Sequence, residues 1–264
     1  MKYSFMSFSC PELSLKELLD TAKRFGYDGI EPRAESKHNH GVEIETDKST
    51  REKIKSEVSQ SGIALSCIAT SCKYSDPSTA EQNVGQTLKF IDLAGDVGVT
   101  KIRVFGGIIP KEITRDVSMA SIVKSLSSVA EHAKTRGVDV CMETHDNWCD
   151  PKHVAEIMKK VNHPNIAVNW DIAHPVTNKL ATIRESFDTL RQWIKHVHFH
   201  DISVQEGKKN ELVPIGQGVV DHKAAVLALR ELGYTGYLSG EWIKWEPWEK
   251  HLPREIAAIK EFDK

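Results

Sequence analysis

The sequence predicts an α/β protein that folds as a single (β/α)8 barrel spanning residues 1–264. Two observations support this prediction. Eight apolar runs typical of strands alternate with eight amphipathic stretches typical of helices, and no linker, repeat or low-complexity segment interrupts them. The length of 264 residues is also that of one such barrel. An open α/β sheet is the alternative architecture.

The elements follow one another in a regular order along the chain. The strand-like runs lie near residues 3–8, 28–32, 63–70, 99–105, 138–143, 165–171, 195–200 and 236–241. Capping boxes at Ser14 with Glu17 and at Ser49 with Glu52 predict the starts of the first two helices. Glycines placed just before the next strand predict the ends of five helices, at Gly26, Gly62, Gly98, Gly137 and Gly233.

The composition is that of an ordinary globular enzyme and excludes several classes of partner. Charged residues make up 27% and the net charge is -2, so the chain lacks the basic face typical of nucleic-acid binding. No apolar run reaches the roughly 18 residues that a membrane span needs. Five cysteines without a CxxC pair predict free thiols and favour a reducing, cytoplasmic location. The composition leaves homo-oligomer formation open.

Four predicted strands in the second half of the chain end in side chains that can bind a metal. Carboxyl ends of parallel strands meet at the mouth of a barrel, where the active sites of this fold lie. Because strand side chains alternate, those at the strand ends share the inward-facing parity. They are Glu143, Asp171, one of His196, His198 and His200, and Glu241. Parity alone does not choose among the three histidines.

Carboxylates gathered in a barrel mouth need a compensating cation, because burial of unpaired charge is costly. Three carboxylates and one imidazole suit a divalent ion with positions left open for substrate. We therefore expect one divalent metal ion, Mn²⁺, with Co²⁺, Mg²⁺ or Zn²⁺ as alternatives. A salt-bridge layer with Arg103 and Lys101 is the alternative interpretation.

The motifs resemble the xylose-isomerase-like TIM-barrel superfamily, which includes ketose 3-epimerases, sugar isomerases and the endonuclease IV branch. The resemblance covers essentially the whole chain, through GYDGIE, KIRVFGG, METH, NWDIAH, HVHFHD and GYTGYLSGEW. In that superfamily the first histidine of an HxxD motif binds the metal. The resemblance thus implies Glu143, Asp171, His198 and Glu241 as ligands, and its DxxH motif implies that His174 contacts substrate or a second metal.

The resemblance also implies a reaction on a small carbohydrate or keto acid. In the epimerase branch, an isomerase or epimerase polarises a ketose carbonyl on the metal. Glu143 and Glu241 would then move a proton through a metal-stabilised enediolate. The ETH triplet, the MKYS start and the WIKHVHF run also resemble metal-dependent 3-dehydroshikimate dehydratases. There a histidine assists proton removal, which makes a lyase the alternative and His145 its catalytic base.

Several further residues are predicted to contact substrate. Besides His174, they are Glu31 and His40 around the second strand-to-helix loop, Arg103 and Trp148. A solvated polar loop is the alternative for His40, and an ion pair with Glu143 is the alternative for Arg103. Trp148 is a candidate for stacking on a sugar ring. The segment Gly216-Gln217-Gly218 predicts a turn, because it lacks the GxGxxG pattern of a phosphate loop.

Overall fold

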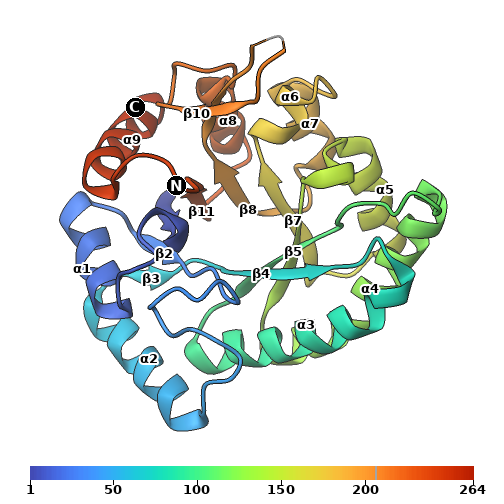
Figure 1. Cartoon of the computed structure of the whole chain (residues 1–264), viewed down its shortest axis with the longest axis horizontal. Helices are drawn as coiled ribbons and strands as arrows, with labels where there is room; N and C mark the ends of the chain where they lie inside the picture. The colour runs from blue at the N-terminus through green and yellow to red at the C-terminus, as the bar shows by residue number, and fades with distance from the viewer. Residues whose placement is uncertain (206) are drawn as a thin grey trace.

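Nine parallel strands form one nearly closed barrel inside a ring of helices, which confirms the prediction of a single TIM barrel (Figure 1). The computed structural model describes residues 1–205 and 207–264. The order in the sheet is β3-β2-β1-β11-β8-β7-β6-β5-β4. The strands are β1 (Lys2–Met6), β2 (Gly29–Glu31), β3 (Ala64–Leu65), β4 (Ile68–Lys73), β5 (Lys101–Phe105), β6 (Asp139–Glu143), β7 (Ile166–Asp171), β8 (Ile194–Phe199) and β11 (Tyr237–Gly240).

The barrel has nine strands in place of the predicted eight because the third strand is broken. Its two pieces, β3 and β4, are separated by Ser66 and Cys67. The backbone of Ser66 still donates to the carbonyl of Ile30, over 2.8 Å. Beyond the break, the chain after β2 pairs with β4 through a parallel bridge between Arg33 and Ala69. This bridge joins the two ends of the sheet.

Helices follow the strands and cover the outside of the barrel (Figure 1). They are α1 (Leu15–Phe25), α2 (Lys48–Ser61), α3 (Pro77–Val97), α4 (Arg115–Arg136), α5 (Pro151–Val161), α6 (Ala173–Thr177), α7 (Ile183–Leu190), α8 (His222–Glu231) and α9 (Trp248–Phe262). Two short strands, β9 (Asp201–Ser203) and β10 (Glu211–Val213), form a hairpin in the loop after β8. No helix in the described part of the chain is long and apolar enough to cross a membrane.

The helix boundaries confirm most of the predicted caps and correct one. Ser14 and Glu17 form the predicted capping box of α1. The box at Ser49 and Glu52 is wrong: Asp47 caps α2, and its carboxylate accepts from the backbone of Thr50 over 2.7 Å. Ser49 therefore lies inside the first turn. The first four predicted glycines end their helices with positive φ angles, and Gly233 follows one residue after the cap of α8.

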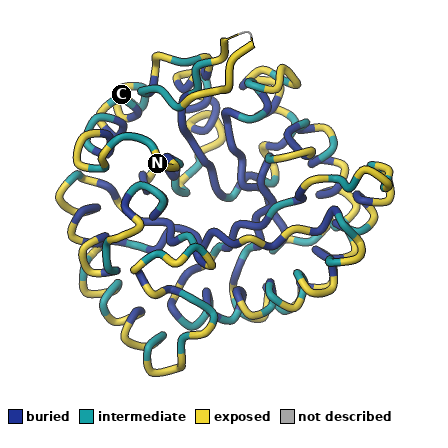
Figure 2. Tube along the Cα trace, in the orientation of Figure 1, coloured by how far each residue is buried: buried dark blue, intermediate teal, exposed yellow. Residues whose placement is uncertain are grey.

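The barrel strands form the buried centre of the molecule, and the outer faces of the helices are exposed (Figure 2). Val140 and Met142 of β6 and Val168 and Trp170 of β7 belong to the apolar core. Their strand neighbours Cys141, Glu143, Asn169 and Asp171 have the opposite parity and are also fully buried. The strands thus place apolar side chains against the helices and polar ones inside the barrel mouth, as the alternation predicts.

Candidate metal centre

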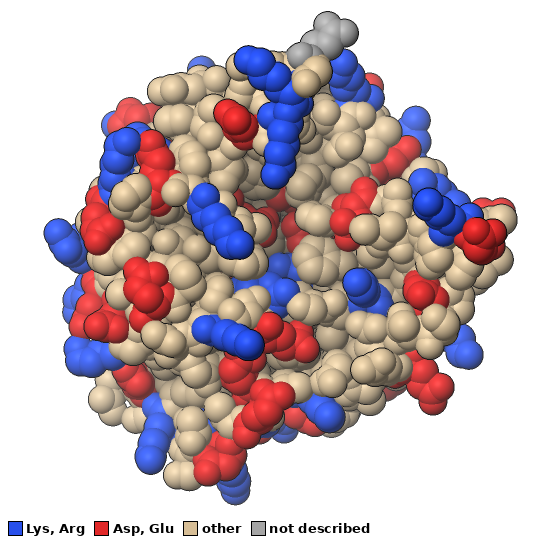
Figure 3. Space-filling model, viewed as in Figure 1, with Lys and Arg blue, Asp and Glu red and all other residues tan. Residues whose placement is uncertain are grey.

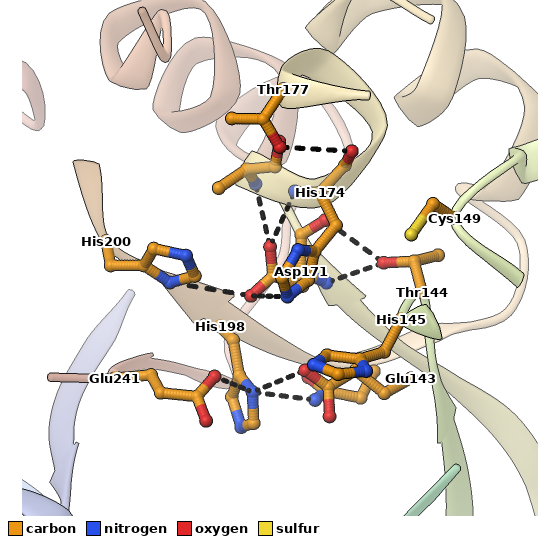
Figure 4. A network of polar contacts seen from close by, with 12 residues as sticks. Glu143, Thr144, His145, Cys149, Asp171, His174, Thr177, His198, His200 and Glu241 are labelled. Atoms are coloured by element: carbon orange, nitrogen blue, oxygen red, sulfur yellow. Dashed lines mark hydrogen bonds and ion pairs between the residues drawn. The ribbon is translucent and has the colours of Figure 1, made fainter. Parts of the chain in front are cut away.

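Glu143, Asp171, His198 and Glu241 converge at the mouth of the barrel (Figure 4). One possible ligand atom from each of the four lies within 4.8 Å of the others. Strand register explains the convergence, because Asp171 pairs with His198 and His198 pairs with Ser239, two residues before Glu241. Glu143 of β6 pairs with Asn169, two residues before Asp171, so the inward side chains near the ends of these four strands share one volume.

His198 lies between the carboxylates, and its two ring nitrogens have different partners. Nδ1 is 3.2 Å from Oε1 of Glu143 and 3.3 Å from Oε2 of Glu241 (Figure 4). Nε2 is 3.1 Å from Oε1 of Glu31. Burial alone would lower the pKa of His198, but Glu31 and Glu143 outweigh it and raise the pKa well above its usual value. The Nδ1 atom is thus the one that faces the centre of the cluster.

Glu31 lies beneath this cluster and has no solvent-exposed surface. Its Oε2 atom is 2.7 Å from Nε2 of His196, and both oxygens face His198. Burial would raise the pKa of Glu31, but the two histidines lower it well below its usual value. The expected substrate contact by Glu31 is not supported, because both of its oxygens are already engaged by the histidines of β8.

Arg103 is paired with Glu143 inside the barrel. Its Nε lies 3.1 Å from Oε2 of Glu143, and both side chains are about 1% exposed. Arg103 Nη1 also donates to the carbonyl of Thr70 over 2.7 Å. Burial would raise the pKa of Glu143, but Arg103 and His198 lower it below its usual range. Arg103 therefore keeps Glu143 ionised. This is the ion pair expected from the sequence as the alternative to a substrate contact by Arg103.

The carboxylate oxygens left without hydrogen bonds test whether a cation fits the cluster. Oδ1 of Asp171 accepts from the backbones of Ala173 and His174. Oδ2 of Asp171 is buried and accepts no hydrogen bond from the described residues, and Oε2 of Glu143 has the ion pair with Arg103 but no hydrogen bond among them. Such oxygens are costly in a protein interior. An oxygen-rich set with one imidazole fits a divalent ion, so the residues present suit the expected metal.

Three more histidines line one side of the cluster (Figure 4). The rings of His145 and His174 are 4.4 Å apart, and Nδ1 of His200 is 3.5 Å from Oδ2 of Asp171. Burial would lower the pKa of His145, but Asp146 and Glu143 raise it to about 9. His145 and His174 lie where the sequence predicts. His200 shares the inward parity of His198 and is one of the three candidate ligands of this strand; the resemblance selects His198, and the structure places His200 beside Asp171.

Two predicted substrate contacts lie away from this volume. Trp148 is fully buried, and its Nε1 donates to Oγ of Ser75 over 2.7 Å, so the indole offers no free face for stacking on a sugar. His40 is 3% exposed. Its Nδ1 accepts from the backbone of Val42, and its Nε2 donates to the carbonyl of Arg33. His40 thus fastens its own loop, which explains its burial without a ligand.

The loop after β8 is tied to the barrel through Asp201. Oδ2 of Asp201 accepts from the backbones of Gly216 and Gly218, each over 2.9 Å. Oδ1 accepts from the backbones of Ile202 and Val220. A Cβ atom on Gly218 would lie 2.1 Å from Oδ1 of Asp201, so this close approach requires glycine. The predicted turn at residues 216–218 is therefore held by a carboxylate.

This arrangement of strand-end ligands agrees with the comparison with known proteins. Residues 19–262 match the family model described as xylose isomerase-like TIM barrel. The chain belongs to this family. A curated relative, 3-dehydroshikimate dehydratase from Bacillus anthracis, is 24% identical over 261 residues, which cover 92% of this chain and 91% of the relative.

Solved structures with the same fold include both epimerases and dehydratases. The probable 3-DHS dehydratase AsbF, involved in petrobactin synthesis in Bacillus anthracis, is similar with a TM-score of 0.82 and 22% identity, over 98% of this chain and 99% of that one. An L-ribulose 3-epimerase is similar with a TM-score of 0.81 and 18% identity, over 99% and 94%. At these identities the structural likeness establishes the fold.

Metal ions are present in other structures of this fold. The IOLI protein, solved with a zinc atom, is similar with a TM-score of 0.78 and 19% identity, over 99% of this chain and 96% of that one. A xylose isomerase-like protein from Mycobacterium smegmatis, in complex with magnesium, is similar with a TM-score of 0.75 and 17% identity, over 99% and 96%. Members of this fold thus include proteins that hold a divalent cation.

Proposed function

We propose that this protein is a divalent-metal-dependent isomerase or epimerase of a small ketose or keto-sugar derivative. The convergence of Glu143, Asp171, His198 and Glu241 carries the proposal. Among the described residues, the buried Oδ2 of Asp171 accepts no hydrogen bond, and a cation would compensate it. Four strands of a barrel would not otherwise bring three carboxylates together at the end of the fold where catalysis takes place.

The four converging residues would hold the ion, with Nδ1 of His198 as the nitrogen ligand. We propose Mn²⁺, because carboxylate oxygens with one imidazole suit it. The zinc and magnesium in the structures named above make these ions the alternatives. When bound there, the ion would act as a Lewis acid on the carbonyl oxygen of a substrate and make the neighbouring C–H more acidic.

Glu143 and Glu241 are the proposed groups that remove and return the proton. Glu143 ends β6, Glu241 follows β11, and the two face Nδ1 of His198 on two sides (Figure 4). Burial would raise the pKa of Glu241, but its hydrogen bond and charge interaction with His198 lower it. Both groups are thus ionised and able to accept a proton. Two bases on opposite sides of one carbon can remove a proton from one face and return it to the other.

A dehydratase is the second candidate, and one arrangement in the site favours it. His145 lies beside Glu143 in a cluster with His174, next to the proposed metal. The charges of Asp146 and Glu143 favour the protonated ring, and a cation bound at Glu143 would offset them and favour the neutral ring that a base requires. The relative from Bacillus anthracis that covers 92% of this chain is a 3-dehydroshikimate dehydratase. In this case His145 would remove the proton next to the ketone, and the hydroxyl on the following carbon would leave as water with a proton from the site.

Proton exchange in D₂O tests the proposal. The protein is incubated with Mn²⁺ and a panel of ketoses and hydroxylated keto acids, and the substrates are examined by NMR and mass spectrometry. We expect deuterium at the carbon next to the carbonyl, in a product that keeps its oxygen atoms. A product lighter by one water would select the dehydratase. Absence of exchange across the panel, with metal binding verified, would overturn both candidates.

A further inference from the structure

Arg33 is a partly buried arginine at the barrel mouth whose hydrogen-bond partners are all neutral. It follows β2, and its Nη2 donates to Oγ of Ser71 over 2.5 Å. Nη1 donates to the backbone carbonyls of Ala34 and, over 3.4 Å, Ala69. The guanidinium also lies 5.9 Å from the ring centre of Phe8. These contacts fix the direction of the side chain but leave its charge unbalanced.

No carboxylate in residues 1–205 or 207–264 lies within 4.0 Å of the Arg33 guanidinium, in contrast to Arg103, which is paired with Glu143. Two acids of the same loop are engaged elsewhere: Glu35 accepts from the backbone of Ser71, and Glu43 accepts from the backbone of Glu35. Burial and the positive charge of Arg103 lower the pKa of Arg33 to about 10, against the weaker influence of Glu35, Glu241 and Glu43. Arg33 is therefore a positive charge that lacks a close counter-ion.

The surroundings of Arg33 place this charge next to the proposed metal centre. Arg33 follows Glu31, the contact of His198, by two positions, and it bridges to Ala69, the neighbour of Thr70, whose carbonyl accepts from Arg103. The space-filling view shows lysine and arginine side chains on the floor and rim of the central hollow, beside the acidic groups within it (Figure 3). Nε and one hydrogen of Nη2 have no acceptor among the described residues, so two donors remain for an incoming group.

We propose that Arg33 binds an anionic group of the substrate, a carboxylate or a phosphate, while the ketone of the same molecule occupies the metal centre. Two free N–H groups and a permanent charge match the oxygens of either group. The inference rests on the proposed function for the location of the ketone. It narrows the substrates to charged keto acids or sugar phosphates and disfavours neutral sugars.

Matched pairs of charged and neutral ligands test this inference without turnover. The first pair is shikimate and its methyl ester, and the second is D-fructose 6-phosphate and D-fructose. Dissociation constants are measured by calorimetry on the Mn²⁺-loaded protein and on its Arg33→Gln, Arg33→Lys and Arg191→Gln variants. Arg191 is an exposed arginine just before β8, at the opposite end of the barrel from the mouth, and serves as the control.

We expect the charged member of one pair to bind at least about tenfold more tightly than its neutral partner. Arg33→Gln should remove this preference, Arg33→Lys should keep part of it, and Arg191→Gln should leave it unchanged. The pair that responds identifies carboxylate or phosphate. The inference is overturned if neither pair prefers its charged member, or if Arg33→Gln keeps the preference. Because binding is the readout, a failure of the proton-exchange experiment would not by itself affect this result.

Discussion

Glu31 contacts Nε2 of His198 on the side of the imidazole that faces away from Glu143 and Glu241. A carboxylate on one ring nitrogen fixes the orientation of a histidine and makes its other nitrogen a better metal ligand. His196 reaches the same carboxylate over 2.7 Å, so Glu31 joins two histidines of β8 to the end of β2. The position of His198, the proposed nitrogen ligand, thus depends on Glu31, which lies 167 positions earlier in the sequence.

Glu31→Gln should weaken Mn²⁺ binding by about 10- to 100-fold, because the amide lacks the charge that orients His198. The dissociation constant is measured by calorimetry or by the electron paramagnetic resonance of free Mn²⁺. Glu35→Gln, an exposed position in the next loop, is the matched control and should bind normally. Unchanged affinity in Glu31→Gln, with the same melting temperature, would contradict the orienting role.

Glu143→Gln and Glu241→Gln should each reduce proton exchange by about 10²- to 10⁴-fold, because each removes a proposed acid/base group and a metal ligand. Rates are measured at saturating Mn²⁺, so that weaker metal binding does not limit them. The exposed Glu81 of α3 provides the control variant Glu81→Gln, which should be unaffected. Near-normal exchange in either active-site variant would remove that residue from the mechanism.

His145→Gln separates the two candidate reactions. If Glu143 and Glu241 move the proton, exchange next to the carbonyl should stay within about tenfold of the wild type. If His145 is the base of a dehydratase, both exchange and loss of water should fall by about 10²-fold or more. The measurement is the deuterium content and mass of the product with the substrate found in the initial panel. A fall in exchange of about 10²-fold or more in His145→Gln would favour the dehydratase.

His40 should make the fold less stable in acid. Burial lowers the pKa of His40 to about 4. Protonation of Nδ1 would break the hydrogen bond that this atom accepts from the backbone of Val42, and would place a positive charge near His38 and Arg33. Since the unfolded chain binds this proton near pH 6.5, the stabilisation is complete above that pH and is lost as the pH falls towards 4. Between pH 7.5 and 5.5 the loss is about 1 kcal/mol.

Urea unfolding of the wild type and of His40→Gln at these two pH values measures this contribution. The variant should lose about 1 kcal/mol less than the wild type over the interval, whatever its absolute stability, because its amide does not titrate. His132→Gln, at a half-exposed histidine on α4, is the control. Identical pH dependence in His40→Gln and the wild type would show that His40 does not contribute.

The period-two alternation of strands predicted the inward positions of Glu143, Asp171, His198 and Glu241, because this periodicity is local. The contact between Glu31 and His196 spans 165 positions and depends on the barrel's diameter and register, which no local pattern contains. The sequence also does not predict the break of the third strand at Ser66 and Cys67, since the strand-like run continues through these two residues. Trp148 was misplaced because a short 3-10 turn at Asp146–Trp148 directs the indole into the core.

Four backbone N–H groups donate to the carboxylate of Asp201, and this arrangement determines which part of the loop after β8 can change in sequence. These hydrogen bonds attach both the start of the loop after β8 and its end at residues 216–220 to the side chain of Asp201. Asp201 lies three positions beyond His198. The hairpin of β9 and β10 lies between these two anchored ends. Its sequence can therefore be exchanged or lengthened, by evolution or by design, while the proposed metal centre keeps its geometry. The hairpin is thus a replaceable module on a fixed base.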